Sequence, residues 1–193
     1  MTSTSTPATR NFDGVAIPAP GTFEIDASHS TVEFVARHMM VSKVRGRFAT
    51  YSGTIIVAED PLASSVAVTL DAATVQTGDE GRDAHLVGDD FLDAESHPDI
   101  TFRSTSVSPA GGTRFDVVGE LTIRGVTREV NLPAELEGVA TDPWGNERVG
   151  FSARIELDRE EFGLTWNQAL ETGGVLVSKK VAIDIDVQAV RQG

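Results

Sequence analysis

The sequence predicts a mainly β protein, built as a closed up-and-down barrel or a sandwich of about eight long antiparallel strands with one short α-helix. From Thr22 onward, apolar side chains recur at every second position, as in Val32, Phe34 and Ala36. This period is typical of strands with one face on a core and the other in water. No helical period separates the runs, which argues against βαβ units. A chain of 193 residues is long enough for one domain with a substantial core.

The strands are predicted in order along the chain from their alternating apolar sets. Val66, Val68 and Leu70 share one face, as do Ile100 and Phe102. The later sets are Phe115, Val117, Leu121 and Ile123; Val130, Leu132, Ala134 and Leu136; Phe151, Ala153, Ile155 and Leu157; and Val181, Ile183, Ile185 and Val187. The segment 43–58 changes parity between Phe48 and Tyr51, which predicts a β-bulge there.

Residues 79–88 are the one stretch that predicts a helix. Asp79 suits the N-cap, acidic residues follow in the first turn, and Gly88 suits the end. Residues 158–162 predict one further helical turn, and 164–178 predict a loop. Turn-forming residues at 109–112, 124–125 and 142–146 mark the connections between strands.

The first twenty residues are rich in Thr, Ser, Pro and Ala, so we expect a flexible tail over 1–20 and a barrel domain over 21–193. The tail lacks the basic start and apolar run of a secretory signal. Nowhere are there 18 consecutive apolar residues, so no transmembrane helix is predicted. These features favour a cytoplasmic protein.

Composition excludes several classes of function. The net charge of −13 argues against non-specific binding to nucleic acid and against adsorption to anionic membranes. The absence of cysteine excludes disulfides, thiol nucleophiles, cysteine-based zinc sites and iron–sulfur clusters. No dinucleotide, P-loop or nucleophile-elbow motif is present. We therefore predict neither a cofactor nor an enzyme.

Three groups of polar residues are candidates for chemistry. The four histidines (His29, His38, His85 and His97) lack the spacing of a helical metal pair, and no metal site is predicted. Lys43, Arg45 and Arg47 share one strand face, which favours either contact with a phosphate or carboxylate, or a solvated face paired with nearby acids. Arg82 and His85 lie on one face of the predicted helix.

Several motifs, in order along the chain, resemble the YceI-like family. They include Val35-Ala-Arg-His-Met-Met-Val-Ser42, Arg82-Asp-Ala-His-Leu86, His97-Pro-Asp-Ile-Thr-Phe-Arg-Ser104, Gly119-Glu-Leu-Thr-Ile-Arg-Gly-Val-Thr127 and Arg159 through Phe162-Gly-Leu164. The resemblance covers residues 21–190. It implies an extended, lipocalin-like eight-stranded barrel with a long central tunnel, and a homodimer is a further expectation.

The resemblance implies a protein that binds, stores or transports a long-chain lipid inside the barrel. The partner would be a polyisoprenoid, an isoprenoid quinone or a fatty-acid-like lipid. One alternative is an enzyme acting on a lipid- or quinone-like substrate in the same cavity. Another is a filled barrel that serves as a stress-response or interaction module. Many family members carry a secretory signal, whereas this chain begins with a polar segment, which again favours the cytoplasm.

The candidate site residues follow from strand parity and from the local basic features. The tunnel candidates are Phe34, Ala36, Val68, Leu70, Phe102, Val117, Leu121, Phe151, Ile155 and Ile183, with Trp166 at a rim. The candidates for contact with a polar head group are Arg37, His38, Arg45, Arg82 and His85.

Overall fold

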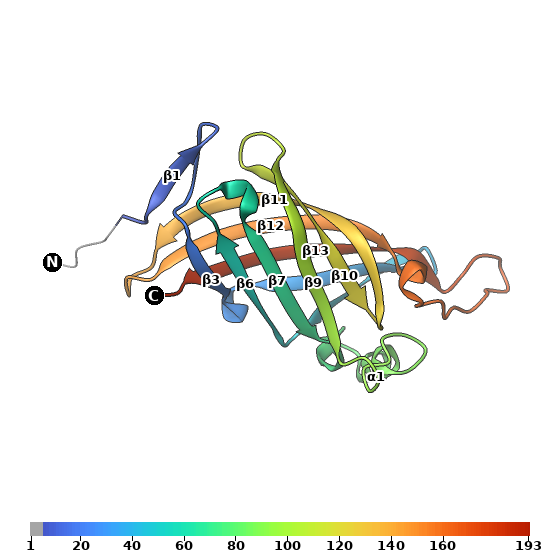
Figure 1. Cartoon of the computed structure of the whole chain (residues 1–193). Helices are drawn as coiled ribbons and strands as arrows, with labels where there is room; N and C mark the ends of the chain where they lie inside the picture. Colours follow the sequence, from blue (N-terminus) through green and yellow to red (C-terminus); the bar gives the residue numbers. More distant parts are fainter. Residues whose placement is uncertain (1–5) are drawn as a thin grey trace.

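The computed structural model describes residues 6–193 and shows a closed antiparallel barrel of eight strands (Figure 1). Pairing of the last two strands, from Arg148↔Val190 to Asp158↔Lys180, closes the wall. The predicted fold class is thus confirmed. The wall strands are β3 (Gly21–Ile25), β6 (Tyr51–Val57), β7 (Ser65–Asp71), β9 (Asp99–Pro109), β10 (Arg114–Ile123), β11 (Val126–Thr141), β12 (Glu147–Asp158) and β13 (Val177–Arg191).

Three further strands extend this wall: β4 (Thr31–His38), β5 (Ser42–Phe48) and β8 (Val75–Gln76). Strand β13 pairs with β3 near its C-terminal end and with β4 along the rest of its length. Strand β5 pairs with β4, and strand β6 pairs with β3. The parity change expected as a bulge in 43–58 is therefore a break at residues 49–50, because the two halves pair with different neighbours.

Four aspartates begin the short 3-10 helices that turn the chain between strands. Each carboxylate accepts a hydrogen bond from the backbone N–H two residues later, which is the Asx turn that favours Asp at such corners. The helices and their caps are η1 (Ala27–His29) with Asp26, η2 (Pro61–Ala63) with Asp60, η3 (Ala72–Thr74) with Asp71, and η4 (Arg159–Phe162) with Asp158. The helical turn predicted at 158–162 is confirmed by η4.

The predicted helix is confirmed as α1 (Glu80–Val87), the one α-helix in residues 6–193. The Asp79 side chain accepts a hydrogen bond from the Arg82 N–H, and Gly88 follows the last turn. Leu86 and Val87 pack against the buried cluster that contains Tyr51 and Leu70. The helix thus contributes its apolar face to the core of the barrel.

Residues 9–18, expected to lie in a flexible tail, instead form a hairpin of β1 (Thr9–Phe12) and β2 (Val15–Pro18). The turn places Asp13 and Gly14 at φ values of 49° and 83°, as a two-residue Asp-Gly hairpin requires. Ile17 is 4% exposed and belongs to a core cluster with Phe23 and Val149. Burial of Ile17 is the physical reason that this segment is ordered. The remainder of the expected tail, residues 1–5, lies outside the described residues.

Candidate functional site

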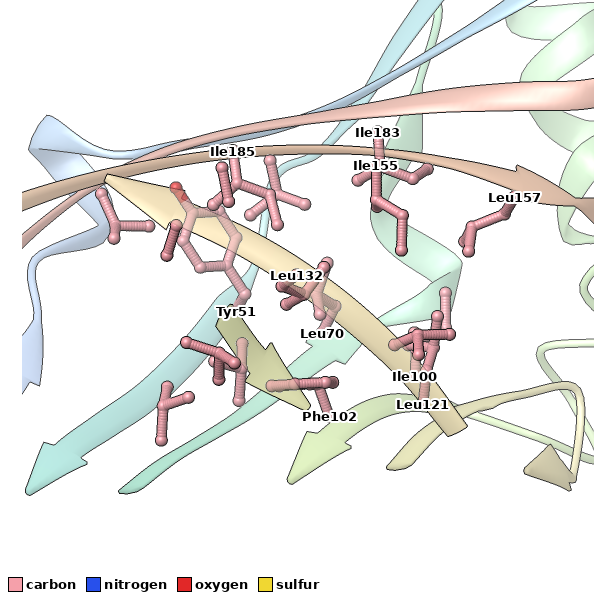
Figure 2. Close-up of a pocket in the computed structure, with 18 of the residues that line it drawn as sticks. Tyr51, Leu70, Ile100, Phe102, Leu121, Leu132, Ile155, Leu157, Ile183 and Ile185 are labelled. Atoms are coloured by element: carbon pink, nitrogen blue, oxygen red, sulfur yellow. The ribbon is translucent and has the colours of Figure 1, made fainter. Parts of the chain in front are cut away.

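The barrel encloses an apolar cavity of about 380 Å³. Its lining draws on strands from around the whole wall, and Figure 2 shows Leu70, Phe102 and Ile155 directed into this space from different strands. All but five of the 44 lining residues are apolar. An apolar cavity holds water poorly and favours an apolar guest. The interior is therefore suited to a hydrocarbon.

Alternation along the strands identified the cavity wall. Ten of the eleven predicted tunnel residues line the cavity: Phe34, Ala36, Val68, Leu70, Phe102, Val117, Leu121, Phe151, Ile155 and Ile183. The eleventh, Trp166, does not. Its ring packs edge-on against His85, with centroids 4.7 Å apart, and lies 5.3 Å from the ring of Phe91. Phe91 lines the cavity, so Trp166 contacts a lining residue without lining the cavity itself.

Most of the polar atoms in the lining have partners within the protein. The Tyr51 hydroxyl donates to the carbonyl oxygen of Ser30 at 2.6 Å. Ser64 accepts from the Ala58 N–H at 3.1 Å, and Ser152 donates to Glu137 at 2.5 Å. Burial also raises the pKa of Tyr51, so the phenol stays neutral. These groups add little polarity to the cavity.

Arg159 is the one charged residue among the 44 lining residues, and it is 7% exposed. Its Nε donates to the carbonyl oxygen of Ser178 at 2.9 Å, and its Nη1 donates to that of Leu164 at 2.5 Å. Its Nη2 is buried and has no hydrogen-bond partner in the structure. Burial lowers the pKa of Arg159, although a guanidinium remains charged in proteins.

Sequence analysis placed Arg159 in a family motif but not among the candidate site residues. The run Asp158-Arg-Glu-Glu161 has the composition of a solvated charged turn, and only the packing of η4 buries its arginine. A buried cation without a carboxylate partner is costly. The N–H groups of Nη2 are therefore buried donors without an acceptor, in a residue that lines the cavity.

None of the five predicted head-group residues lines the cavity. Arg37 and Arg45 are exposed, and His38 is half-buried near the end of β4. The Arg82 guanidinium donates to the hydroxyl and the carbonyl oxygen of Thr77. His85 Nε2 lies 2.9 Å from an oxygen of the partly exposed Asp90. Arg37 and Arg45 lie near each other on the paired strands β4 and β5, but Arg82 and His85 contact other partners.

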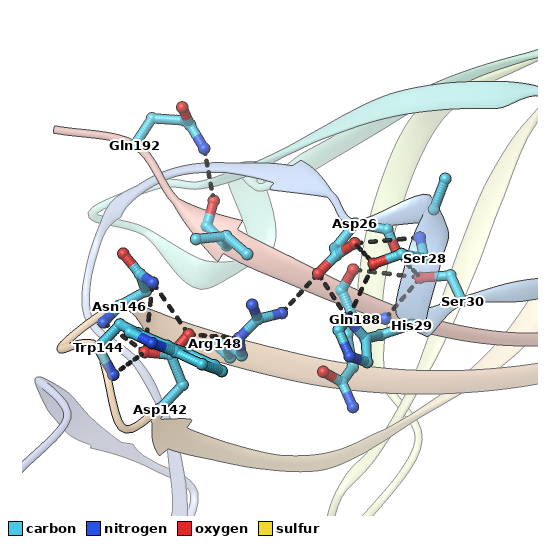
Figure 3. A network of polar contacts seen from close by, with 12 residues as sticks. Asp26, Ser28, His29, Ser30, Asp142, Trp144, Asn146, Arg148, Gln188 and Gln192 are labelled. Atoms are coloured by element: carbon cyan, nitrogen blue, oxygen red, sulfur yellow. Dashed lines mark hydrogen bonds and ion pairs between the residues drawn. The ribbon is translucent and has the colours of Figure 1, made fainter.

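A polar network ties the corner after β3 to the turn between β11 and β12 (Figure 3). Arg148 donates to Asp26 at 2.7 Å and to Asp142 at 2.9 Å. Hydrogen bonds from Arg148, Ser28 and His29 hold the pKa of Asp26 well below its usual range. Burial opposes ionisation of Asp142, but hydrogen bonds from Asn146 and Arg148 outweigh it and lower that pKa as well. The network braces this end of the barrel.

In the described part of the chain, no helix has the length and apolar character that a membrane crossing requires. Among residues 6–193 there is also no cluster of three or more His, Cys, Asp or Glu side chains placed to hold a metal ion.

Comparisons with known proteins agree with this architecture. The YceI-like domain profile matches residues 23–189. The UPF0312 protein of Pectobacterium atrosepticum is 36% identical over 180 residues, which cover 93% of this chain and 90% of that protein. A UPF0312 protein of Staphylococcus aureus is 35% identical over 168 residues, covering 86% of this chain and 95% of that one.

Three solved structures are similar. BcnA of Burkholderia cenocepacia has a TM-score of 0.75 at 25% identity, covering 85% of this chain and 98% of that one. The YceI protein of Campylobacter jejuni has a TM-score of 0.70 at 31% identity, covering 81% and 90%. A polyisoprenoid-binding domain from Saccharophagus degradans shares the fold at 15% identity, with a TM-score of 0.69 and coverage of 90% and 100%. By sequence profile and relatives, the chain belongs to the YceI-like family.

Proposed function

We propose that this protein binds a long-chain isoprenoid or related apolar lipid inside the barrel and stores or carries it. The apolar cavity of about 380 Å³, with a single buried cation in its wall, is the observation that carries the proposal. Family membership, and a structural neighbour described as polyisoprenoid-binding, support the same conclusion.

The volume of the cavity limits the length of lipid chain that it can hold. A methylene group is about as large as a water molecule, so the volume holds on the order of a dozen chain carbons, and the rest of a longer polyprenyl chain would extend out of the cavity. Burying that many carbons contributes about 10 kcal/mol, and association itself costs about 4–15 kcal/mol. Apolar burial alone therefore gives modest affinity, and a head-group contact would decide how tightly the lipid binds.

Arg159 is the residue that we assign to the head group. Its free Nη2 donors suit a phosphate or carboxylate oxygen, or the carbonyl oxygen of a quinone. The two alternatives to a lipid carrier have less support. A filled barrel is disfavoured by the cavity, and the histidine–carboxylate pair of His85 and Asp90, which an enzyme could use, lies outside the lining. A cytoplasmic location and a homodimer stay predictions.

A cavity-filling variant tests the proposal. Ala153 lines the cavity in β12, whereas Arg154, the next residue, points outward and its side chain is 71% exposed. Ala153→Trp should place an indole in the lipid's space and reduce uptake of undecaprenyl phosphate at least tenfold, while Arg154→Trp should leave uptake unchanged. Thermal unfolding would confirm that both variants fold. Equal uptake by a folded Ala153→Trp variant would contradict the proposal.

A further inference from the structure

One end of the barrel exposes apolar side chains at the turn between β4 and β5. Met39, Met40 and Val41 are 43%, 61% and 82% exposed; we call them the apolar tip. Both methionines have left-handed backbone, with φ values of 53° and 58°. A turn optimised for folding would carry Asn or Gly at such positions. Exposed methionines add nothing to the stability of this turn.

The loop 164–176 lies beside the apolar tip. The Met39 N–H donates to the carbonyl oxygen of Leu176 at 2.8 Å. Figure 1 shows this loop extending at the end of the barrel opposite the two termini. Val175 is 36% exposed there, and Glu171 is the only charged residue of the segment. The end thus presents apolar side chains from two adjoining segments.

Basic residues surround the apolar tip. Arg37 and Lys43 are direct cross-strand partners, and Arg45 follows on the same face of β5. Lys180 lies on β13 next to Ser178, whose hydroxyl accepts from the Arg37 N–H. We call Arg37, Lys43, Arg45 and Lys180 the basic collar. All four are exposed.

Within residues 6–193, no ion pair includes a member of the basic collar, and the neighbouring Lys179 is paired with Glu160 at 2.8 Å. Lys180 lies directly opposite Asp158 of β12, whereas Arg37 and Lys43 lie opposite each other and Arg45 lies opposite Val35. Like charges directly opposite on two strands are destabilising. The three lysines of the chain, Lys43, Lys179 and Lys180, all lie at this end, in a protein whose net charge is −13.

We propose that this end of the barrel docks onto an anionic membrane surface, with the apolar tip inserted among the lipids and the basic collar against their phosphates. Amphipathic surfaces with apolar and basic groups bind anionic interfaces in this way. The net negative charge, which argues against general adsorption, favours orientations that bring the basic collar to the surface.

Docking would place the cavity next to the source of its ligand. Ala36 and Val177 line the cavity and lie just inside this end, and Met39 is about 10 Å further along the extended chain. A lipid chain could pass between bilayer and barrel without crossing water. This loading role rests on the proposed function, whereas docking rests on the exposed residues alone.

Cosedimentation with vesicles tests docking. We expect the protein to bind vesicles of equimolar phosphatidylcholine and phosphatidylglycerol, and to bind phosphatidylcholine vesicles far less. Each base of the collar should contribute about fivefold to the partition coefficient. Lys43→Glu/Arg45→Glu should therefore reduce binding at least 25-fold, and high salt should also weaken it. Arg103→Glu/Arg114→Glu, with the same change in net charge at exposed positions of β9 and β10, is the control.

A second variant pair tests the apolar tip. Met40→Ser/Val41→Ser should reduce vesicle binding, while Trp144→Ser should not, although Trp144 is as exposed as Val41, at 82%. Trp144 lies in the turn between β11 and β12, at the other end of the barrel. Absence of vesicle binding, or loss with Trp144→Ser but not with the tip variant, would overturn the proposal, and so would equal loss with the control charge variant.

Lipid binding in the cavity and docking on a membrane surface can be tested separately. Uptake of undecaprenyl phosphate delivered from ethanol should be unchanged in the tip and collar variants, while uptake from vesicles should slow. Vesicle binding by a protein that takes up no lipid would leave docking intact and contradict the lipid carrier. Uptake from vesicles at an unchanged rate in both variants would contradict loading through this end.

Discussion

Replacing Arg159 with methionine tests whether the cavity recognises a head group. The substitution keeps an unbranched apolar stem in the wall and removes the one charge among the 44 described residues that line the cavity. It also removes the bonds to the carbonyl oxygens of Leu164 and Ser178. A loss of affinity for one lipid would therefore mix the head-group contact with a change in the loop after η4.

Comparison of two ligands separates these effects. Undecaprenyl phosphate and undecaprenol share one chain and differ in the head group, so any change in the loop affects both. A hydrogen bond to a charged group contributes about 1.5–3 kcal/mol, and the buried Nη2 is unpartnered. One such bond corresponds to about a 10- to 150-fold change in affinity. Arg159→Met should weaken binding of the phosphate by this factor more than binding of the alcohol.

The assay is a titration of wild type and variant with each lipid, followed by quenching of intrinsic tryptophan fluorescence. Trp166 packs on Phe91, which lines the cavity, so an occupied cavity should change its emission. Equal weakening of both lipids would show that Arg159 only holds the loop. No weakening of either would place the head group elsewhere and refute the assignment.

Three further changes have defined outcomes. Phe102→Asp, at a cavity position that is 6% exposed, should abolish lipid uptake. Arg103→Asp, on the outer face of the same strand, should leave uptake unchanged. Lipid uptake by a folded Phe102→Asp variant would count against the cavity assignment. Ile17→Ala should lower the free energy of unfolding by about 2–4 kcal/mol, measured by urea denaturation, whereas a flexible tail would give no change. Because Arg148 lowers the pKa of Asp26 in the folded protein, the free energy of unfolding should fall as the pH drops below about 4. Arg148→Met should weaken this pH dependence, measured as urea denaturation midpoints across that pH range. An unchanged pH dependence in the variant would refute the role of the Arg148–Asp26 pair.

Period-two alternation predicted the barrel wall well because one face of every strand is apolar. Side chains that alternate strictly, such as Leu121 and Ile155, lie inside as expected. Alternation cannot locate a break between strands, so the end of β5 at Phe48 and the start of β6 at Tyr51 were interpreted as a bulge. A break and a bulge change parity in the same way.

The N-terminal hairpin was missed because composition outweighed a local signal. Asp13-Gly14 between short apolar runs is a hairpin turn, yet the Thr- and Pro-rich surroundings favoured a tail. Arg159 was missed for a different reason. Nothing local distinguishes it from the exposed arginines, since its burial comes from contacts with Ser178 and Leu164. Local patterns cannot identify a charge that is buried by tertiary packing.

Native mass spectrometry of freshly purified protein, followed by organic extraction, tests the central claim most directly. A lipid carrier should show a stoichiometric adduct that is lost on denaturation and extracts as a long-chain lipid. The same spectrum would report monomer or dimer. A bare mass, together with failure to take up undecaprenyl phosphate or a ubiquinone added afterwards, would contradict lipid binding and favour an interaction module.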